Sequence, residues 1–207
     1  MSAPNNPNRP WNLSRRESGE RRMRRVELPI ETPHLRLREF RHEDFEAVCR
    51  YVTDPRVSRF LFHAPADLDE ARSYLTGVIG YQRERPRAVW ELAIDERRTG
   101  RHIGACNLTI VAPGEGDIGY MLHADTWRRG YASEVACALR DAAFRDLGLQ
   151  RVMATVDVRN EPSMRVLEKA GLRWEATYRK LRRARGQWRD CHLFTMARIV
   201  WQESAAT

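Results

Sequence analysis

Apolar and polar positions follow two periods along the first half of the chain, and these periods predict its helices and strands. Near-alternation in TPHLRLREF predicts a strand at about 35–40. Apolar residues at helical spacing then predict two helices, over 41–54 and over 67–86, the second ended by Pro86. Three further strands joined by turn residues are expected to form an antiparallel meander, at about 88–96, 102–112 and 117–124.

The second half continues this alternation of helices and strands. A helix is predicted to begin near Gly130 and a strand to follow at about 149–158. A short helix is predicted within 160–171, with Asn160 or Glu161 as its cap and Gly171 just past its end. Two last strands are expected, at about 172–183 and 188–201. The pattern predicts an α+β fold, with a mixed, mostly antiparallel sheet of about six to seven strands and helices on both faces.

Composition divides the 207 residues into a tail, 1–28, and one domain, 29–207. Residues 1–25 hold seven arginines and two glutamates, 7 − 2 = +5 of the net charge of +8, among prolines, asparagines and serines. Such a segment is predicted to be disordered. It is either a solvated extension or an arm that touches acidic surfaces such as nucleic acid, and Met23 is an alternative start.

Several classes of protein are excluded by what the sequence lacks. No apolar run approaches the roughly 18 residues that span a bilayer, and the N-terminus has no apolar signal core, so we expect a cytoplasmic protein without membrane contact. The four cysteines form no CxxC pair, and the six histidines show no ligand spacing. We therefore expect no metal, and cysteines that act as small apolar groups.

The stretch ADTWRRGYASEVACALRDAAF, residues 124–144, places two arginines and a glycine where a helix is expected to begin. A helix N-terminus offers free N–H groups and a partial positive charge, which suit phosphate. Gly130 lets a ligand approach the backbone, and Arg128 and Arg129 can donate charge-assisted hydrogen bonds. The motifs GxxxxGK[ST] and GxGxxG are absent. The stretch predicts a phosphate cradle, with a basic, solvated helix start as the alternative.

The order of the motifs resembles the GCN5-related N-acetyltransferase (GNAT) superfamily over roughly residues 33–201. The strand DIGYMLHA leads into TWRRGYASEVA, and the strand VMATVDV leads into NEPSMRVLEKAGL. The chain is most similar to the branch of ribosomal-protein alanine N-acetyltransferases. Two runs carry the likeness: Trp127, Arg128, Arg129, Gly130, Tyr131 and Ala132, then Asn160, Ser163, Glu168, Lys169 and Gly171. Trp127 stands where the family has Gln or Arg.

The resemblance implies acetyl-CoA as cosubstrate and no metal. The pyrophosphate would then lie on the N–H groups of about 128–133, and the pantetheine arm along the preceding strand as an added strand would. Asn160 would cap its helix and contact the arm. The implied cofactor-binding residues are Met121, Leu122, His123, Arg128, Arg129, Gly130, Tyr131, Ala132, Ser133, Asn160 and Ser163.

The resemblance also implies the catalytic residues, Ser163 and Asp117. Ser163 would serve the CoA sulfur, or else it only makes a first-turn backbone bond. Asp117 would be the general base, or else a solvated carboxylate at a strand end, and Glu91 and Asp190 are the other candidates.

The acceptor would be a primary amine, on a protein N-terminus or a small molecule. The last predicted hairpin carries a cluster of cations: Arg179, Lys180, Arg182, Arg183, Arg185 and Arg189. This cluster suggests that the acceptor carries acidic groups; the alternative is that the charges only keep an edge strand soluble. Two other functions stay open: a nucleic-acid or ribosome-binding protein led by the tail, and a CoA-binding sensor without catalysis. Monomer and homodimer are both compatible with the sequence.

Overall fold

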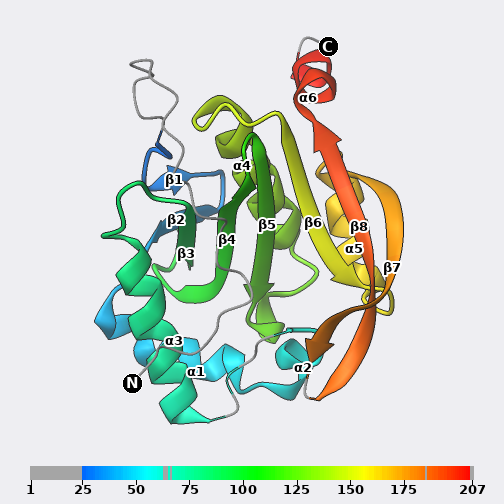
Figure 1. The fold of residues 1–207 in the computed structure, drawn as a ribbon. Helices are drawn as coiled ribbons and strands as arrows, with labels where there is room; N and C mark the ends of the chain where they lie inside the picture. Colours follow the sequence, from blue (N-terminus) through cyan, green and yellow to red (C-terminus); the bar gives the residue numbers. More distant parts are fainter. Residues whose placement is uncertain (1–24, 63–64, 66, 185, 206–207) are drawn as a thin grey trace.

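The computed structural model describes residues 25–62, 65, 67–184 and 186–205. In these residues eight strands form one sheet in the order β1-β2-β3-β4-β5-β6-β8-β7 (Figure 1). The strands are β1 (Ile30–Glu31), β2 (Leu35–Glu39), β3 (Val89–Glu96), β4 (His102–Ala112), β5 (Glu115–Leu122), β6 (Arg151–Asp157), β7 (Arg173–Ala184) and β8 (Gln187–Ala197). Every neighbouring pair is antiparallel except β5 and β6, which are parallel. The predicted mixed, mostly antiparallel sheet and its central meander are confirmed.

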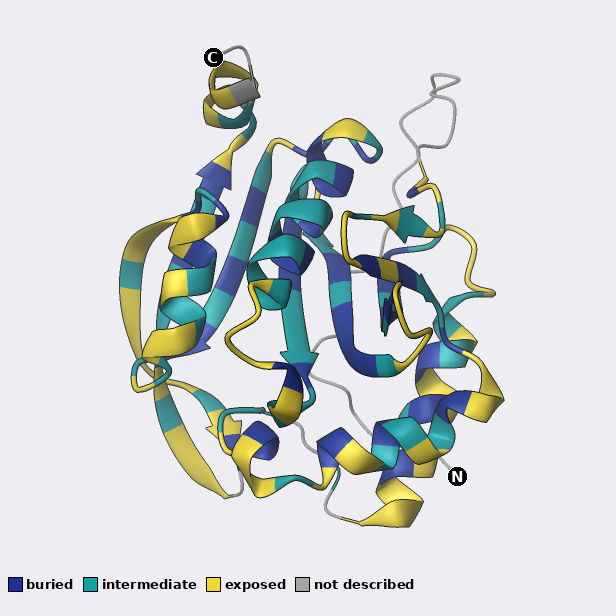
Figure 2. Ribbon diagram, turned by 180° about the vertical axis from the view of Figure 1, so that it is seen from behind, coloured by how far each residue is buried: buried dark blue, intermediate teal, exposed yellow. Residues whose placement is uncertain are grey.

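Helices cover both faces of this sheet, as predicted. They are η1 (His42–Asp44), α1 (Phe45–Val52), α2 (Pro55–Ser58), α3 (Leu68–Tyr81), η2 (Ala124–Thr126), α4 (Tyr131–Arg145), α5 (Glu161–Lys169) and α6 (Arg198–Ala205). Helices α1 and α3 lie on the face seen in Figure 1, and α4 and α5 lie on the opposite face, which Figure 2 shows.

Alternation along the strands gives each face its own core. In β3, Leu92 and Ile94 belong to the larger core, which includes the buried sides of α4 and α5. Ala93, between them in sequence, belongs to the smaller core with α1 and α3. Strands β3, β4 and β5 pair in continuous register along Val89–Ile94 of β3. Alternate residues of these strands therefore point to opposite faces of the sheet, and so to different helices.

Local signals explain where α4 and α5 begin. Gly130, the N-cap of α4, has φ +83°, a left-handed conformation that glycine adopts at little cost. The Asn160 side chain accepts a hydrogen bond from the Ser163 N–H at 3.3 Å, so the predicted cap of α5 is confirmed. Gly171, with φ +84°, lies just past the end of that helix, also as predicted.

Several element boundaries differ from the sequence prediction. The first predicted helix, 41–54, is divided into η1 and α1. After it, Asp54 accepts from the Arg56 N–H and caps a separate short helix, α2, which begins at Pro55. Helix α3 ends at Tyr81 and not near Pro86. The last predicted strand ends at Ala197, where α6 begins; Trp201 of α6 packs on Phe144 and donates to Asp141 at 2.7 Å. Local capping by Asp54 decides the first of these boundaries, and the long-range contacts of Trp201 decide the last.

The predicted basic tail lies mostly outside the described residues. Its described part includes Val26, which is buried in the larger core, and Leu28, which packs against it. The proposed contact of the tail with nucleic acid falls on residues 1–24 and stays a prediction. Within the described chain, none of the helices has the length and apolar character to cross a membrane.

Candidate active site

The site lies where β5 and β6 separate. These parallel strands pair only through Glu115–Asp117 and Arg151–Met153, and they diverge toward their C-terminal ends (Figure 1). A cavity of about 1070 Å³ opens there, lined by both strands, the start of α4, the helix α5 and the segment after α2. From Ile118 to Leu122, no described strand pairs with the β6 side of β5. An extended ligand arm could therefore add to this edge.

The start of α4 forms one end of the cavity, as the predicted phosphate cradle requires. Tyr131, Ala132 and Ser133 line it, and their N–H groups have no intrahelical acceptors in the first turn. A Cβ placed on Gly130 would meet no described atom within 4 Å, so the space in front of the helix is open. Arg128 also lines the cavity. These features fit the pyrophosphate of a CoA ester.

The side chains of Arg129 and its neighbour Arg128 have different surroundings. It does not line the cavity, and its guanidinium lies 3.5 Å from a carboxylate oxygen of Glu96 at the end of β3. The same oxygen accepts from the Tyr131 hydroxyl at 2.8 Å. Glu134 accepts from the His34 N–H at 2.8 Å. Arg129 therefore helps to fix the helix start from outside, and a direct contact with the cofactor stays a prediction.

Along β5, the predicted cofactor residues are divided as well. Met121 and Leu122 line the cavity, whereas His123 does not. The His123 N–H donates to the Ile103 carbonyl at 2.8 Å, and its ring accepts from the Asp125 N–H at 3.3 Å. His123 thus forms the turn that joins β5 to η2.

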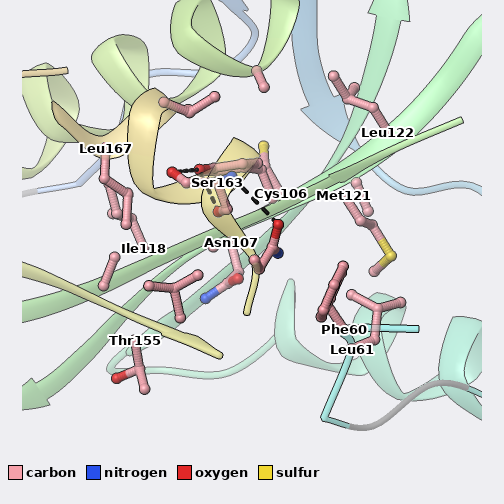
Figure 3. Close-up of a pocket in the computed structure, with 18 of the residues that line it drawn as sticks. Phe60, Leu61, Cys106, Asn107, Ile118, Met121, Leu122, Thr155, Ser163 and Leu167 are labelled. Carbon is pink, nitrogen blue, oxygen red and sulfur yellow. Dashed lines mark hydrogen bonds between the residues drawn. The ribbon is translucent and has the colours of Figure 1, made fainter. Parts of the chain in front are cut away.

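Ser163 of α5 meets a residue that sequence reasoning missed. The Tyr120 hydroxyl lies 2.8 Å from Ser163 Oγ and also donates to the Ser163 carbonyl at 3.2 Å, and both residues line the cavity. Figure 3 shows Ser163 in this cavity. Burial raises the pKa of Tyr120 well above its ordinary value, although the hydrogen bond with Ser163 opposes this. Tyr120 is therefore protonated at neutral pH. The available signal was parity, which places Tyr120 on the same face as Ile118, toward α5.

Two carboxyl groups lie on the other face of the sheet. Glu91 of β3 is opposite Asn107, and Asp117 of β5 is opposite Thr109, so all four share the face covered by α1 and α3. Burial raises the pKa of Glu91 to about 8. Burial also raises the pKa of Asp117 to about 7, against the lowering effect of the Arg182 charge. Both carboxyls line the cavity and titrate where a general base is useful.

The third candidate base is placed elsewhere. Asp190 does not line the cavity, and its carboxylate accepts from the Lys180 N–H at 2.8 Å. Lys180 has φ +50° at a register shift between β7 and β8. This contact stabilises an irregular stretch of the hairpin, which gives Asp190 a structural task.

The predicted cation cluster contributes one described residue to the cavity, Arg182. Its guanidinium lies over the Phe62 ring, 5.9 Å from the centroid. Arg183 Nε instead donates to the Gly186 carbonyl at 3.1 Å, and Arg189 Nε lies 4.0 Å from Asp157. Arg185 lies outside the described residues. Elsewhere, the described chain holds no group of three His, Cys, Asp or Glu residues arranged for a metal ion.

Comparison with known proteins identifies the family to which the chain belongs. The family model described as Acetyltransferase (GNAT) domain matches residues 34–173. The chain belongs to the GNAT acetyltransferase family. The resemblance to the GNAT superfamily is confirmed, and this GNAT protein is an acetyl-CoA-dependent N-acetyltransferase.

Individual relatives align with this chain over most of their length. The uncharacterized N-acetyltransferase p20 of Bacillus licheniformis is 29% identical over 80% of this chain and 93% of its own. A GNAT-family acetyltransferase of Bacillus anthracis superposes with a TM-score of 0.74 at 24% identity, covering 82% and 98% of the two chains. RimL, a ribosomal L7/L12 α-N-protein acetyltransferase solved with coenzyme A, has a TM-score of 0.71 at 18% identity, over 82% and 97%. The solved structures support the fold.

Proposed function

We propose that this GNAT protein transfers the acetyl group of acetyl-CoA to a primary amine by direct attack in a ternary complex. One observation carries the proposal: a single cavity joins the helix start of α4 and the Tyr120–Ser163 pair on one face to Asp117 and Glu91 on the other. Cosubstrate and acceptor can therefore enter from opposite faces and meet in the gap between β5 and β6. Holding both in place is itself a large source of rate.

The chain's residues suit the parts of this reaction. The N–H groups that begin α4, together with Arg128, would bind the pyrophosphate. The unpaired β5 edge near Met121 would hold the pantetheine arm, and a backbone N–H there would polarise the thioester carbonyl. Acetyl-CoA supplies the activated acetyl group. Each of these placements rests on the cavity and on the family.

Proton transfers divide between the two faces. The Asp117 carboxylate would remove a proton from the acceptor amine, with Glu91 as the second candidate. Tyr120 has one hydroxyl proton, and when it points at Ser163 Oγ, the serine proton is free to reach the leaving thiolate. The acceptor would be a protein N-terminus or a small-molecule amine.

Calorimetric titration with acetyl-CoA tests the cosubstrate site. Ser133→Glu places a carboxylate in the first turn of α4, where it suits the helix dipole but repels phosphate. Ser133→Ala is the matched control without the charge. We expect micromolar binding in wild type and Ser133→Ala, and its loss in Ser133→Glu with an unchanged melting temperature.

An amine panel tests transfer. Peptides and small amines would be incubated with acetyl-CoA, and free thiol and acetylated product measured together. Product that appears in step with thiol supports the proposal. Tight acetyl-CoA binding with no acetylated product from any amine contradicts it and favours the non-catalytic sensor.

A further inference from the structure

The acceptor half of the cavity has an apolar wall built from distant parts of the chain. Phe60, Leu61 and Phe62 come from the segment after α2, and Met121 and Met153 come from the diverging strands. In Figure 3, Phe60 and Leu61 lie near Met121, on the other side of the cavity from Ser163. Two aromatic rings and three flexible apolar chains suit an acceptor with an apolar body.

Beside this wall, two opposite charges face the same space. Asp117 stands on β5, and Arg182 reaches in from β7, near enough that its charge acts on the carboxyl. The Arg182 guanidinium also lies over the Phe62 ring, so the cation and the apolar wall are continuous. An anionic group on the acceptor would find its partner at Arg182, and an amine would find its partner at Asp117.

We propose that the acceptor is a free α-amino acid with an apolar side chain, recognised at its amine by Asp117, at its carboxylate by Arg182 and at its side chain by Phe60 and Phe62. This rests on the acetyl transfer proposed above and names the substrate class for that site. In an α-amino acid the amine and carboxylate stand on one carbon, so both charges meet their partners while the side chain fills the apolar wall.

Two other acceptors fit this half of the cavity less well. A polyamine would bring a second cation toward Arg182 and the aromatic wall, where like charge repels it. A protein N-terminus carries an amide where the amino acid has its carboxylate, so it would not form the charge-assisted bond with Arg182. The contact with Arg182 is therefore what discriminates among primary amines.

The chemical step balances without a further reactant. The ammonium of the amino acid first gives one proton to the Asp117 carboxylate. The neutral nitrogen attacks the thioester carbon, a C–N bond forms and the C–S bond breaks. The nitrogen then gives its second proton to the thiolate by way of Ser163, which forms the N-acetyl amino acid and the free CoA thiol. Asp117 releases the first proton to solvent and is a carboxylate again.

Three acceptors that share a phenyl ring and a primary amine test the assignment: phenylalanine, phenylalaninamide and phenethylamine. Of these, phenylalanine alone carries the carboxylate. For wild type we expect kcat/KM for phenylalanine to exceed that of the other two by about tenfold or more, the usual effect of a bond between charged groups. Arg182→Gln should remove this preference, mainly by raising KM for phenylalanine. Arg183→Gln is the matched control, because Arg183 neighbours Arg182 but bonds to the Gly186 carbonyl outside the cavity.

Other results would overturn the inference. These are equal rates for the three acceptors, a preference for the amide, or a preference that survives Arg182→Gln. Acetyl-CoA titration and the melting temperature of each variant show whether it is folded. A peptide N-terminus in the same panel separates the two proposals: peptide acetylation without amino-acid acetylation overturns this inference alone, and no acetylation of any amine overturns both.

Discussion

The hydroxyl of Tyr120 on β5 lies 2.8 Å from Oγ of Ser163 on α5, inside the cavity that opens between β5 and β6. The two residues are 43 positions apart in sequence, and the fold around the diverging strands brings them together. This contact joins the serine hydroxyl to a buried phenol that stays protonated at neutral pH. In the proposed reaction, this pair would supply the proton that the leaving thiolate gains.

Tyr120→Phe keeps the ring and removes this hydroxyl. We expect kcat to fall by about tenfold or more, because a positioned general acid contributes on the order of 10²–10⁴-fold. The kcat of Ser163→Ala should fall at least as far. The double variant should be no slower than Ser163→Ala, since the two hydroxyls act as one unit. Thiol release at saturating acetyl-CoA measures this, and multiplying losses in the double variant would show two independent roles.

The pH profile should identify the base. A carboxylate base must be deprotonated, so kcat/KM should rise with pH through about 7, the pKa of Asp117. Asp117→Asn should remove that limb and lower the plateau by about 100-fold or more. Asp190→Asn, outside the cavity, should keep the profile. A wild-type limb near 8 that disappears in Glu91→Gln would transfer the role to Glu91.

Two adjacent arginines should differ in their effect on acetyl-CoA binding. Arg128 lines the cavity, whereas the guanidinium of Arg129 lies beside Glu96. We expect Arg128→Ala to raise Kd by about tenfold, the size of one charge-assisted contact, with a weaker dependence on salt than wild type. Arg129→Ala should raise Kd by less. Calorimetry at two salt concentrations measures both, and the reverse order would mean that Arg129 turns toward the ligand.

Two further arginines, one in a buried network and one in a surface ion pair, should differ in their contribution to the free energy of unfolding. Arg38 of β2 donates to Asp44 at two positions, 2.8 Å each, and to Asp95 at 2.6 Å, all three side chains being largely buried. Arg36, two residues earlier, pairs with Glu31 at the surface. Arg38→Gln should lower the free energy of unfolding by about 3–5 kcal/mol, and Arg36→Gln by less than about 1 kcal/mol. Urea denaturation measures both, and equal effects would contradict this ranking.

The same network gives stability a dependence on pH. Burial acts to raise the pKa of Asp44 and Asp95, but their hydrogen bonds outweigh it and hold both below their ordinary value. A carboxyl whose folded pKa is depressed contributes stability that is present above its unfolded pKa, about 4, and is lost as the pH falls through the folded pKa. Wild type should therefore lose unfolding free energy below about pH 4, and Arg38→Gln should lose less over the same range.

Local patterns were enough to predict most of the fold. The αL glycine at 130, the Asn160 cap and Gly171 past the end of α5 are local signals, and each is found where the sequence places it. The central meander followed from alternation and turn residues. The end of β8 was predicted wrongly, because the contact of Trp201 with Phe144 decides it and leaves no periodic trace. The end of α3 also differs from the prediction, at Tyr81 and not near Pro86.

By itself, then, the sequence determined the order of the elements, the helix start that suits a phosphate and the family, because each rests on neighbouring residues. Tertiary structure alone decided that Tyr120 meets Ser163, that Arg129 turns to Glu96, and that Arg182 is the described cation of its cluster that reaches the cavity. Such contacts depend on strand register and on the divergence of β5 from β6, and both are set by pairing between residues far apart in the chain.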